Sequence, residues 1–352
     1  MIKNTFIKTK VLHFKEPFQI AYETVKSAPV VFLKITDNLG NFGLGNACPD
    51  PEVTGETHKD SLKILKTKLT EKFFDLPFDS WDTYHEKIQK EFKGYPAAQS
   101  AAQEAIIYLT AKIRGEKPFN FLNQKKKTAP IMITIGIKNE KETVIDIKKR
   151  LKQKYKIIKL KCGLDLTKDI TRIKLARKII PKNIKLILDA NQGYSFDQAS
   201  KLLRALKGYS IDLIEQPIAA KNLIGLKKLN QLNLLPIIAD ESVITYADAE
   251  KILKGDYAAG VNIKLAKCGG PINFIKIYDL AKSLKKTMMI GCMYESNISM
   301  TTGTYLALGL NLDYVDLDTG HLDFPDDPTI GGAKVKKGEI FIGSNLNLRK
   351  IQ

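Results

Sequence analysis

Charged side chains follow short apolar runs at regular intervals through the middle of the chain. Successive members of this series are separated by 28, 26, 25 and 24 residues. Such a spacing fits one strand, one helix and the two loops that join them. In a parallel barrel built from these units, the carboxyl ends of the strands meet at one mouth, where catalytic side chains lie. The members of the series are Lys161, Asp189, Glu215, Asp240 and Lys264.

The three carboxylates of the series predict a metal site. Asp189, Glu215 and Asp240 would repel one another at a shared mouth unless a cation lay among them. Oxygen ligands select a hard ion such as Mg²⁺. The alternative is that each acid caps the following helix or pairs with a lysine. Because three acids occur in order at matched spacing, we favour the metal site.

The lysines that flank the acids predict proton transfer. Lys161 precedes the acids and Lys264 follows them, so we expect the two amines on opposite sides of the ion. In a partly desolvated site beside a divalent cation, an ammonium loses its proton more readily and can serve as a general base. A base on each face of a planar intermediate is what inversion of a carbon centre requires. Lys159 shares a strand face with Lys161 and could neutralise developing negative charge.

The strands and helices expected around these residues predict a barrel. Continuous Ile, Leu and Val runs alternate with amphipathic helical patterns, which is typical of a parallel sheet covered by helices. Eight such runs suggest a closed sheet. The expected strands lie at 130–137, 156–163, 184–194, 211–217, 236–242, 260–270, 287–296 and 314–318.

The remaining residues predict a second, smaller domain. Residues 1–14 and 29–47 alternate apolar and polar side chains, as antiparallel strands do, and 14–28 read as a long connecting loop. Residues 58–114 have helical spacing. We expect a capping domain at 1–125, a barrel at 126–322, and a β-rich tail at 323–352 that returns to the capping domain.

Composition argues against several functional classes. The formal net charge is +18, but only 6 of the 56 basic residues are arginine, the residue that nucleic-acid recognition favours, so we expect no nucleic-acid partner. No stretch is apolar enough for a signal peptide or a bilayer span, so we expect no membrane partner and a cytoplasmic location. The four cysteines show no CxxC spacing, which favours reduced thiols.

Five motifs in fixed order resemble the enolase superfamily, in its muconate-lactonizing subgroup: KLK at 159–161, LDAN at 188–191, IEQP at 214–217, ADES at 239–242 and NIKLAKCGG at 262–270. The resemblance implies a modified TIM barrel of (β/α)7β type with an N-terminal α+β cap completed by the tail. It implies one Mg²⁺ per subunit, held by the three acids. It also implies that Lys161 and Lys264 are the acid/base pair, and that Mg²⁺ acts as a Lewis acid while the proton α to a carboxylate is removed and an enediolate forms.

The substrate class depends on the eighth strand. Members of the subgroup include cycloisomerases, o-succinylbenzoate synthases, N-acylamino-acid racemases and dipeptide epimerases. Asp316 and Asp318 lie on one face of a strand and suit an ammonium group, a pattern similar to that of the dipeptide epimerases. The resemblance therefore implies an isomerase that inverts the α-carbon of the C-terminal residue of a dipeptide. A competing explanation is a local turn network of these acids with His321 and Asp323.

Side-chain specificity is less well defined by the sequence. The commonest relatives act on L-Ala-D/L-Glu, a peptide of peptidoglycan metabolism, and we take this dipeptide as the lead substrate. In that type an arginine of the first cap loop pairs with the glutamate, whereas this chain has Glu23 there. Either Lys26 substitutes or the substrate is cationic or broader; o-succinylbenzoate synthase and muconate cycloisomerase are further alternatives. We expect a homo-oligomer, and a pocket lined by Thr134, Cys292, Met293, Tyr294 and Glu23.

Overall fold

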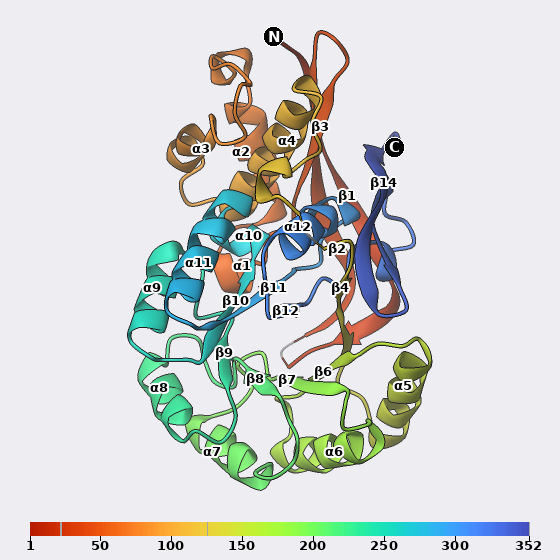
Figure 1. Ribbon diagram of the computed structural model, residues 1–352, viewed down its shortest axis with the longest axis vertical. Helices are drawn as coiled ribbons and strands as arrows, with labels where there is room; N and C mark the ends of the chain where they lie inside the picture. Colours follow the sequence, from red (N-terminus) through yellow and green to blue (C-terminus); the bar gives the residue numbers. More distant parts are fainter. Residues whose placement is uncertain (22, 125, 352) are drawn as a thin grey trace.

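The computed structural model describes residues 1–21, 23–124 and 126–351. It consists of an eight-stranded parallel barrel and an antiparallel cap, which confirms the expected fold class (Figure 1). The expected boundary between cap and barrel falls on Lys125, and the expected tail ends at Gln352; both residues lie outside the described ranges. Within those ranges, every helix is too short or too polar to cross a bilayer.

The cap begins with a three-stranded antiparallel sheet. Its strands are β1 (Ile2–Gln19), β2 (Thr24–Asp37) and β3 (Phe42–Ala47). The prediction of a long loop at 14–28 is wrong, because Phe18 pairs with Val25 and Gln19 with Thr24. Pro17 lies where the register shifts, and β1 is an edge strand, where a missing amide donor is tolerated. The hairpin therefore reaches further than the sequence predicts.

Helices cover this sheet on one side. The most buried is α4 (Pro96–Ile113), which has a proline in its first turn. It packs so closely on β3 that a Cβ at Gly43 would clash with the carbonyl oxygen of Ala105. The alanine-rich sequence of α4 makes this contact possible. The other cap helices are α1 (Pro51–Thr54), α2 (His58–Lys68), η1 (Glu71–Phe73), α3 (His85–Glu91) and η2 (Asn120–Leu122).

The barrel strands follow one another in sequence order, and each pairs in parallel with the next. The expected first strand divides: Ala129–Pro130 (β4) pairs with the C-terminal hairpin, and only Met132–Ile135 (β5) joins the barrel. The other seven barrel strands are β6 (Ile157–Lys161), β7 (Lys185–Asp189), β8 (Leu213–Glu215), β9 (Ile237–Ala239), β10 (Gly260–Lys264), β11 (Thr287–Gly291) and β12 (Tyr314–Val315).

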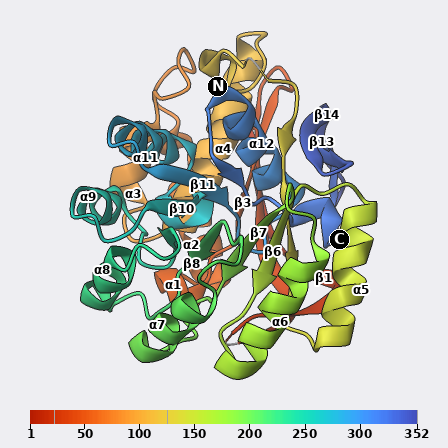
Figure 2. The same ribbon diagram turned by 60° about the horizontal axis from the view of Figure 1, so that its bottom comes forward.

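Helices surround the barrel on its outer side (Figure 2). Most of them begin at a residue whose side chain caps the helix; Thr245 and Asp248, for example, bond to each other's backbone amides in a capping box. The helices are α5 (Glu140–Lys152), α6 (Leu166–Ile179), α7 (Phe196–Ala205), α8 (Leu223–Gln231), α9 (Tyr246–Lys254), α10 (Leu265–Cys268), α11 (Pro271–Ser283), α12 (Asn297–Gly309) and η3 (Gly320–Leu322).

The chain ends in a hairpin of β13 (Thr329–Lys336) and β14 (Glu339–Leu348). Its inner edge pairs with β4, so it adds no strand to the cap sheet. Side chains beyond it still reach the cap, because Ile351 packs in one apolar cluster with Leu12 and Phe32. The Lys8 ammonium also donates to the Ile351 carbonyl oxygen at 3.3 Å.

Candidate active site

The alternation of side chains along each barrel strand places the charged groups inside. On β6, Ile158 and Leu160 pack outward with the helices, whereas Ile157 belongs to the apolar cluster that fills the barrel interior. Because successive strand residues face opposite sides, Lys159 and Lys161 follow Ile157 on the inner face. The same period of two leads from Ile187 to Asp189, from Leu213 to Glu215 and from Ile238 to Asp240 on the next three strands. The inner apolar layer consists of Met132, Ile157, Ile187, Leu213, Ile238 and Met289.

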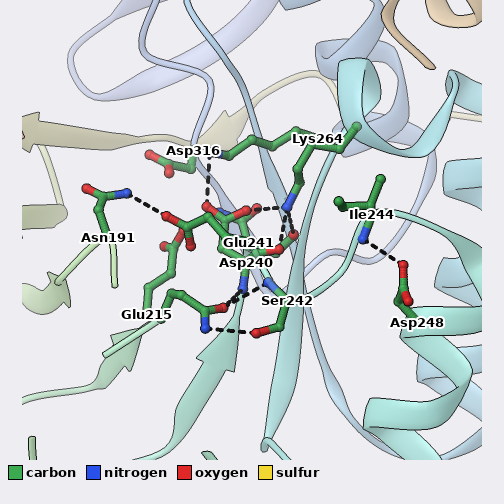
Figure 3. Close-up of polar contacts among 12 residues, drawn as sticks. Asn191, Glu215, Asp240, Glu241, Ser242, Ile244, Asp248, Lys264 and Asp316 are labelled. Carbon is green, nitrogen blue, oxygen red and sulfur yellow. Dashed lines mark hydrogen bonds and ion pairs between the residues drawn. The ribbon is translucent and has the colours of Figure 1, made fainter. Parts of the chain in front are cut away.

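Strand register then brings the predicted acids together. Lys161 pairs with Asp189 across β6 and β7, and Asp189 pairs with Glu215 across β7 and β8. Asp240 follows directly after β9, the next strand. All three carboxylates are buried, with at most 1% of each residue exposed. Figure 3 shows Glu215 and Asp240 in one cluster with Lys264 and Asp316.

Lys159 lies at the centre of these acids. Its ammonium is 2.8 Å from Asp189 Oδ2, 2.8 Å from Glu215 Oε2 and 2.6 Å from Asp316 Oδ2. Burial lowers the pKa of Lys159, but the three carboxylates outweigh it and hold the pKa well above its usual range. Lys159 therefore places a positive charge against three of the acids, where it can neutralise negative charge.

The two flanking lysines approach the acids from different strands. Lys161 Nζ lies 2.7 Å from Asp189 Oδ2 and 2.8 Å from Asn191 Oδ1, and Lys264 Nζ lies 2.9 Å from Asp240 Oδ2. Strands β7, β8 and β9 separate their strands in the sheet. Burial lowers the pKa of Lys264, but Asp240 and its neighbouring acids raise it well above the ordinary value. A cation that neutralised those acids would remove the cause of that increase.

The electrostatics of the acids show an excess of negative charge. Burial raises the pKa of Glu215, and Asp189 raises it further, so that it is well above the usual range. Burial, followed by Asp240, raises the pKa of Glu241 to about 7. For Asp240 the nearby Lys264 and Lys267 outweigh burial and hold the pKa well below the usual range. The raised pKa values of Glu215 and Glu241 thus reflect crowded, buried carboxyls that a further cation would relieve.

The carboxylates of the cluster are the kind of ligand that a hard cation prefers, but in this structure they surround the Lys159 ammonium. In the described residues, no three acid, histidine or cysteine side chains are placed to share a metal ion. The reason is that the Lys159 ammonium lies against Asp189 and Glu215. The available donors are all oxygens, and Oε2 of Glu241 is buried without a hydrogen-bond partner. Buried carboxylate oxygens are the ligands that suit Mg²⁺.

The two aspartates after β12 have different surroundings. Asp316 contacts Lys159 through Oδ2, while its Oδ1 is buried without a hydrogen-bond partner. Asp318 Oδ2 accepts a hydrogen bond from the Thr134 amide at 2.7 Å. The His321 ring, which the alternative turn network would place against these acids, instead contacts Thr329 Oγ1 at 2.7 Å. Asp316 therefore has an acceptor available for a positively charged ligand.

A cavity of about 1100 Å³ opens above these groups, between the barrel mouth and the cap. Lys159, Lys161, Lys264, Asp316 and Asp318 line it, whereas the three proposed metal ligands lie beneath. The expected pocket residues Thr134, Cys292, Met293 and Tyr294 also line it. Glu23, also expected to line the pocket, is not among the lining residues; it is exposed next to the lining residue Tyr294, whose hydroxyl donates to Glu23 Oε1 at 3.3 Å.

Several residues of the cluster were not singled out from the sequence. Asn191 binds Lys161 and also donates to Glu241 Oε1 at 3.2 Å. Lys267 contacts Asp240 and is fully buried. Asn262 donates to Glu215 Oε1 at 2.8 Å. Asn191 lies in the motif LDAN, and Asn262 and Lys267 lie in NIKLAKCGG. Their place in these motifs could have marked them as site residues.

Comparison with known proteins identifies this architecture. Residues 2–119 match the model of the mandelate racemase/muconate lactonizing enzyme N-terminal domain, and residues 142–344 match an enolase C-terminal domain-like model. The chain is 30% identical over 345 residues to the L-Ala-D/L-Glu epimerase of Clostridium acetobutylicum, covering 97% of this chain and 96% of that protein. It is 32% identical over 339 residues to the L-Lys-D/L-Arg epimerase of Desulforapulum autotrophicum, covering 96% and 95%.

A solved structure shows the same similarity. The chain superposes with a TM-score of 0.90 on a dipeptide epimerase from Methylococcus capsulatus complexed with Mg and the dipeptide L-Arg-D-Lys. The sequences are 27% identical, and the match covers 98% of both chains. Cap and barrel are therefore both shared with this neighbour.

Proposed function

The chain belongs to the mandelate racemase/muconate lactonizing enzyme family of the enolase superfamily, and on that premise we propose that it is a Mg²⁺-dependent dipeptide epimerase. The reaction removes the α-proton of the C-terminal residue and returns a proton to the opposite face. The observation that carries the proposal is the placement of Lys161 and Lys264 on strands separated by three others, with the acids between them. Such an arrangement gives a substrate one amine on each side.

One Mg²⁺ per subunit is proposed, held by Asp189, Glu215 and Asp240. When bound, it would stabilise negative charge on the substrate carboxylate. Lys159 adds a positive charge beside the same acids. Lys161 and Lys264 exchange roles: one removes the α-proton as the base, and the other, protonated, supplies a proton from the far side. For this role one of the two amines must be neutral, which requires that the carboxylates beside it be compensated.

The substrate amine is proposed to bind at Asp316. Its Oδ1 is buried, accepts no hydrogen bond and belongs to a residue that lines the cavity. Burying an unpaired carboxylate oxygen is costly, and an ammonium would remove that cost. Asp318, next on the same face, adds negative charge. This feature favours a dipeptide with a free amino end over acylated or aromatic acids.

The charges around Glu23 favour a substrate whose C-terminal side chain is cationic, rather than the L-Ala-D/L-Glu substrate taken as the lead from the sequence. The Glu23 pKa is raised by partial burial, and next by Asp50. Glu52 raises it further, so the charged groups acting most on Glu23 are also acidic. A glutamate side chain placed here would meet like charge, whereas lysine or arginine would meet opposite charge. We therefore propose a dipeptide with a basic C-terminal residue.

The proposal is tested by proton NMR of a dipeptide panel in deuterated buffer. The expected result is Mg²⁺-dependent loss of the α-proton signal of the second residue, fastest with L-Ala-L-Lys and L-Ala-L-Arg. EDTA should stop the exchange, and added Mg²⁺ should restore it. Absence of exchange with cationic, acidic and hydrophobic dipeptides alike would reject the epimerase. Exchange with L-Ala-L-Glu alone would keep the epimerase and reject the cationic specificity.

The rival activities give different results. An o-succinylbenzoate synthase or muconate cycloisomerase has a substrate without an amine, so Asp316→Ala should leave its rate unchanged. A charge-driven binder would lose its ligand on addition of salt and would ignore EDTA.

A further inference from the structure

Two lysines three residues apart contact the same carboxylate. Lys264 Nζ lies 2.9 Å from Asp240 Oδ2, and Lys267 Nζ contacts Oδ1 of the same side chain. Lys264 ends β10, and Lys267 lies on the short helix α10 (Leu265–Cys268) that follows directly. Asp240 is therefore held at both oxygens, one by each lysine.

The two lysines differ in access and in hydrogen bonding. The Lys267 side chain is 0% exposed, and its ammonium also donates to the carbonyl oxygens of Asp240 at 2.6 Å and Asn262 at 3.3 Å. These three acceptors use the three donors of an ammonium. The Lys264 side chain is 13% exposed and lines the cavity. Lys267 is thus fixed, whereas Lys264 can reach a ligand.

The position of Lys267 connects it to the proposed metal ligands. Asp240 follows β9, Asn262 lies on β10, and the Asn262 side chain donates to Glu215. Lys267 therefore links the ends of two strands beneath the acids. A buried lysine is costly unless its charge is compensated, and Asp240 provides that compensation.

We propose that Lys267 is a positioning residue for the metal centre. By holding Oδ1 of Asp240, it leaves Oδ2 directed toward Lys264 and the place proposed for the ion. This inference rests on the proposed function, because it requires Asp240 to be a metal ligand. Lys267 touches neither substrate nor ion. Loss of a group that orients a metal ligand typically weakens metal affinity about 10–100-fold.

The test compares Lys267→Met with the wild type by calorimetric titration of metal-free protein with Mg²⁺, without substrate. The Mg²⁺ dissociation constant should rise at least about 10-fold. With a dipeptide substrate at saturating Mg²⁺, kcat should fall more than KM rises, because the substrate-binding side chains are unchanged. Lys267→Arg, which keeps the charge, should recover part of the metal affinity.

Arg177→Met provides the matched control. Arg177 is also a buried cation, but it donates only to carbonyl oxygens beyond the end of α6, among them those of Ile180 and Pro181. This variant should lose stability while its Mg²⁺ affinity stays unchanged. If Lys267 were merely structural, Lys267→Met would behave in the same way.

An unchanged or tighter Mg²⁺ dissociation constant in folded Lys267→Met would overturn the proposal. Should that variant not fold, crystals of the wild type with and without Mg²⁺ decide: Lys267 must keep its contacts with Asp240 O and Oδ1 in both. Loss of either contact on metal binding would also overturn it. A wild type that binds no Mg²⁺ would instead reject the metal assignment itself, so the two failures are distinguishable.

Discussion

Oδ2 of Asp318 accepts a hydrogen bond from the Thr134 backbone amide at 2.7 Å, and so joins the first barrel strand to the segment after the last one. The two residues are 184 positions apart in sequence. The strands themselves, β5 and β12, lie at opposite ends of the order in which the barrel strands pair. A side chain thus bridges the seam of the barrel.

Asp318→Ala should therefore reduce stability as well as activity. The Thr134 amide loses its acceptor, and we expect the free energy of unfolding to fall by about 1–2 kcal/mol. Urea denaturation followed by circular dichroism measures it. Asp316→Ala is the matched variant, because Lys159 keeps Asp189 and Glu215 as partners. Asp316→Ala should lose substrate binding but lose less stability than Asp318→Ala. A larger loss of stability in Asp316→Ala would contradict the proposal that Asp318 bridges the seam of the barrel.

Glu23 should control the preference for side-chain charge. Glu23→Gln should lower kcat/KM for L-Ala-L-Lys about fivefold, mainly through KM, because a partly exposed charge pair contributes about 1 kcal/mol. Glu23→Arg should shift the ratio of kcat/KM values toward L-Ala-L-Glu. Glu71→Gln removes an exposed carboxylate of the cap at the start of η1. It should change neither kcat/KM for L-Ala-L-Lys nor the ratio of the Lys and Glu values. An unaltered Lys-to-Glu ratio in Glu23→Arg would rule out this role.

Glu104 should make the fold less stable as the pH rises from about 4.5 to about 8. It is buried on α4, where it accepts hydrogen bonds from Ser299 Oγ at 2.8 Å and the Asn46 amide at 3.2 Å. Burial, followed by Glu295, raises its pKa from 4.5 to about 8. The unfolded chain releases this proton above its ordinary pKa, while the folded chain keeps it until about pH 8. Stability should therefore fall between these two values and show no further loss from Glu104 above them.

Glu104→Gln keeps the shape of the side chain and removes its titration. Denaturation midpoints measured from pH 5 to pH 9 should decline less steeply in this variant than in the wild type. Ser299→Ala is the control, because it removes a hydrogen bond of Glu104 without removing the ionisable group. Parallel curves for Glu104→Gln and the wild type would show that Glu104 ionises normally in the folded chain.

Much of the barrel could be predicted because strand residues alternate faces. In KIIKLK the inner positions of Lys159 and Lys161 follow from the period of two, and the same holds for Asp189 and Glu215 on their strands. Regular spacing supplied the order of the strands. The relative placement of the acids follows from these two features, since neighbouring parallel strands end at the same edge.

The errors have physical causes. Pro17 and its charged neighbours indicated a loop, but an edge strand with a register shift accommodates them. Lys267 lies on a helical turn after its strand, where alternation no longer predicts direction, and a lysine is rarely expected to be fully buried. The contact of Lys159 with Asp189 and Glu215 depends on side-chain torsions that sequence patterns do not encode.

The two-base arrangement is tested most directly by following α-proton exchange separately for each epimer of the substrate dipeptide in deuterated buffer. Lys161→Ala and Lys264→Ala should each abolish net epimerisation, by at least about 10²-fold. Each variant should still exchange the α-proton of one epimer, and the epimer should differ between the two variants. Continued epimerisation by either variant, or exchange of the same epimer by both, would contradict amines on opposite faces of the reacting carbon.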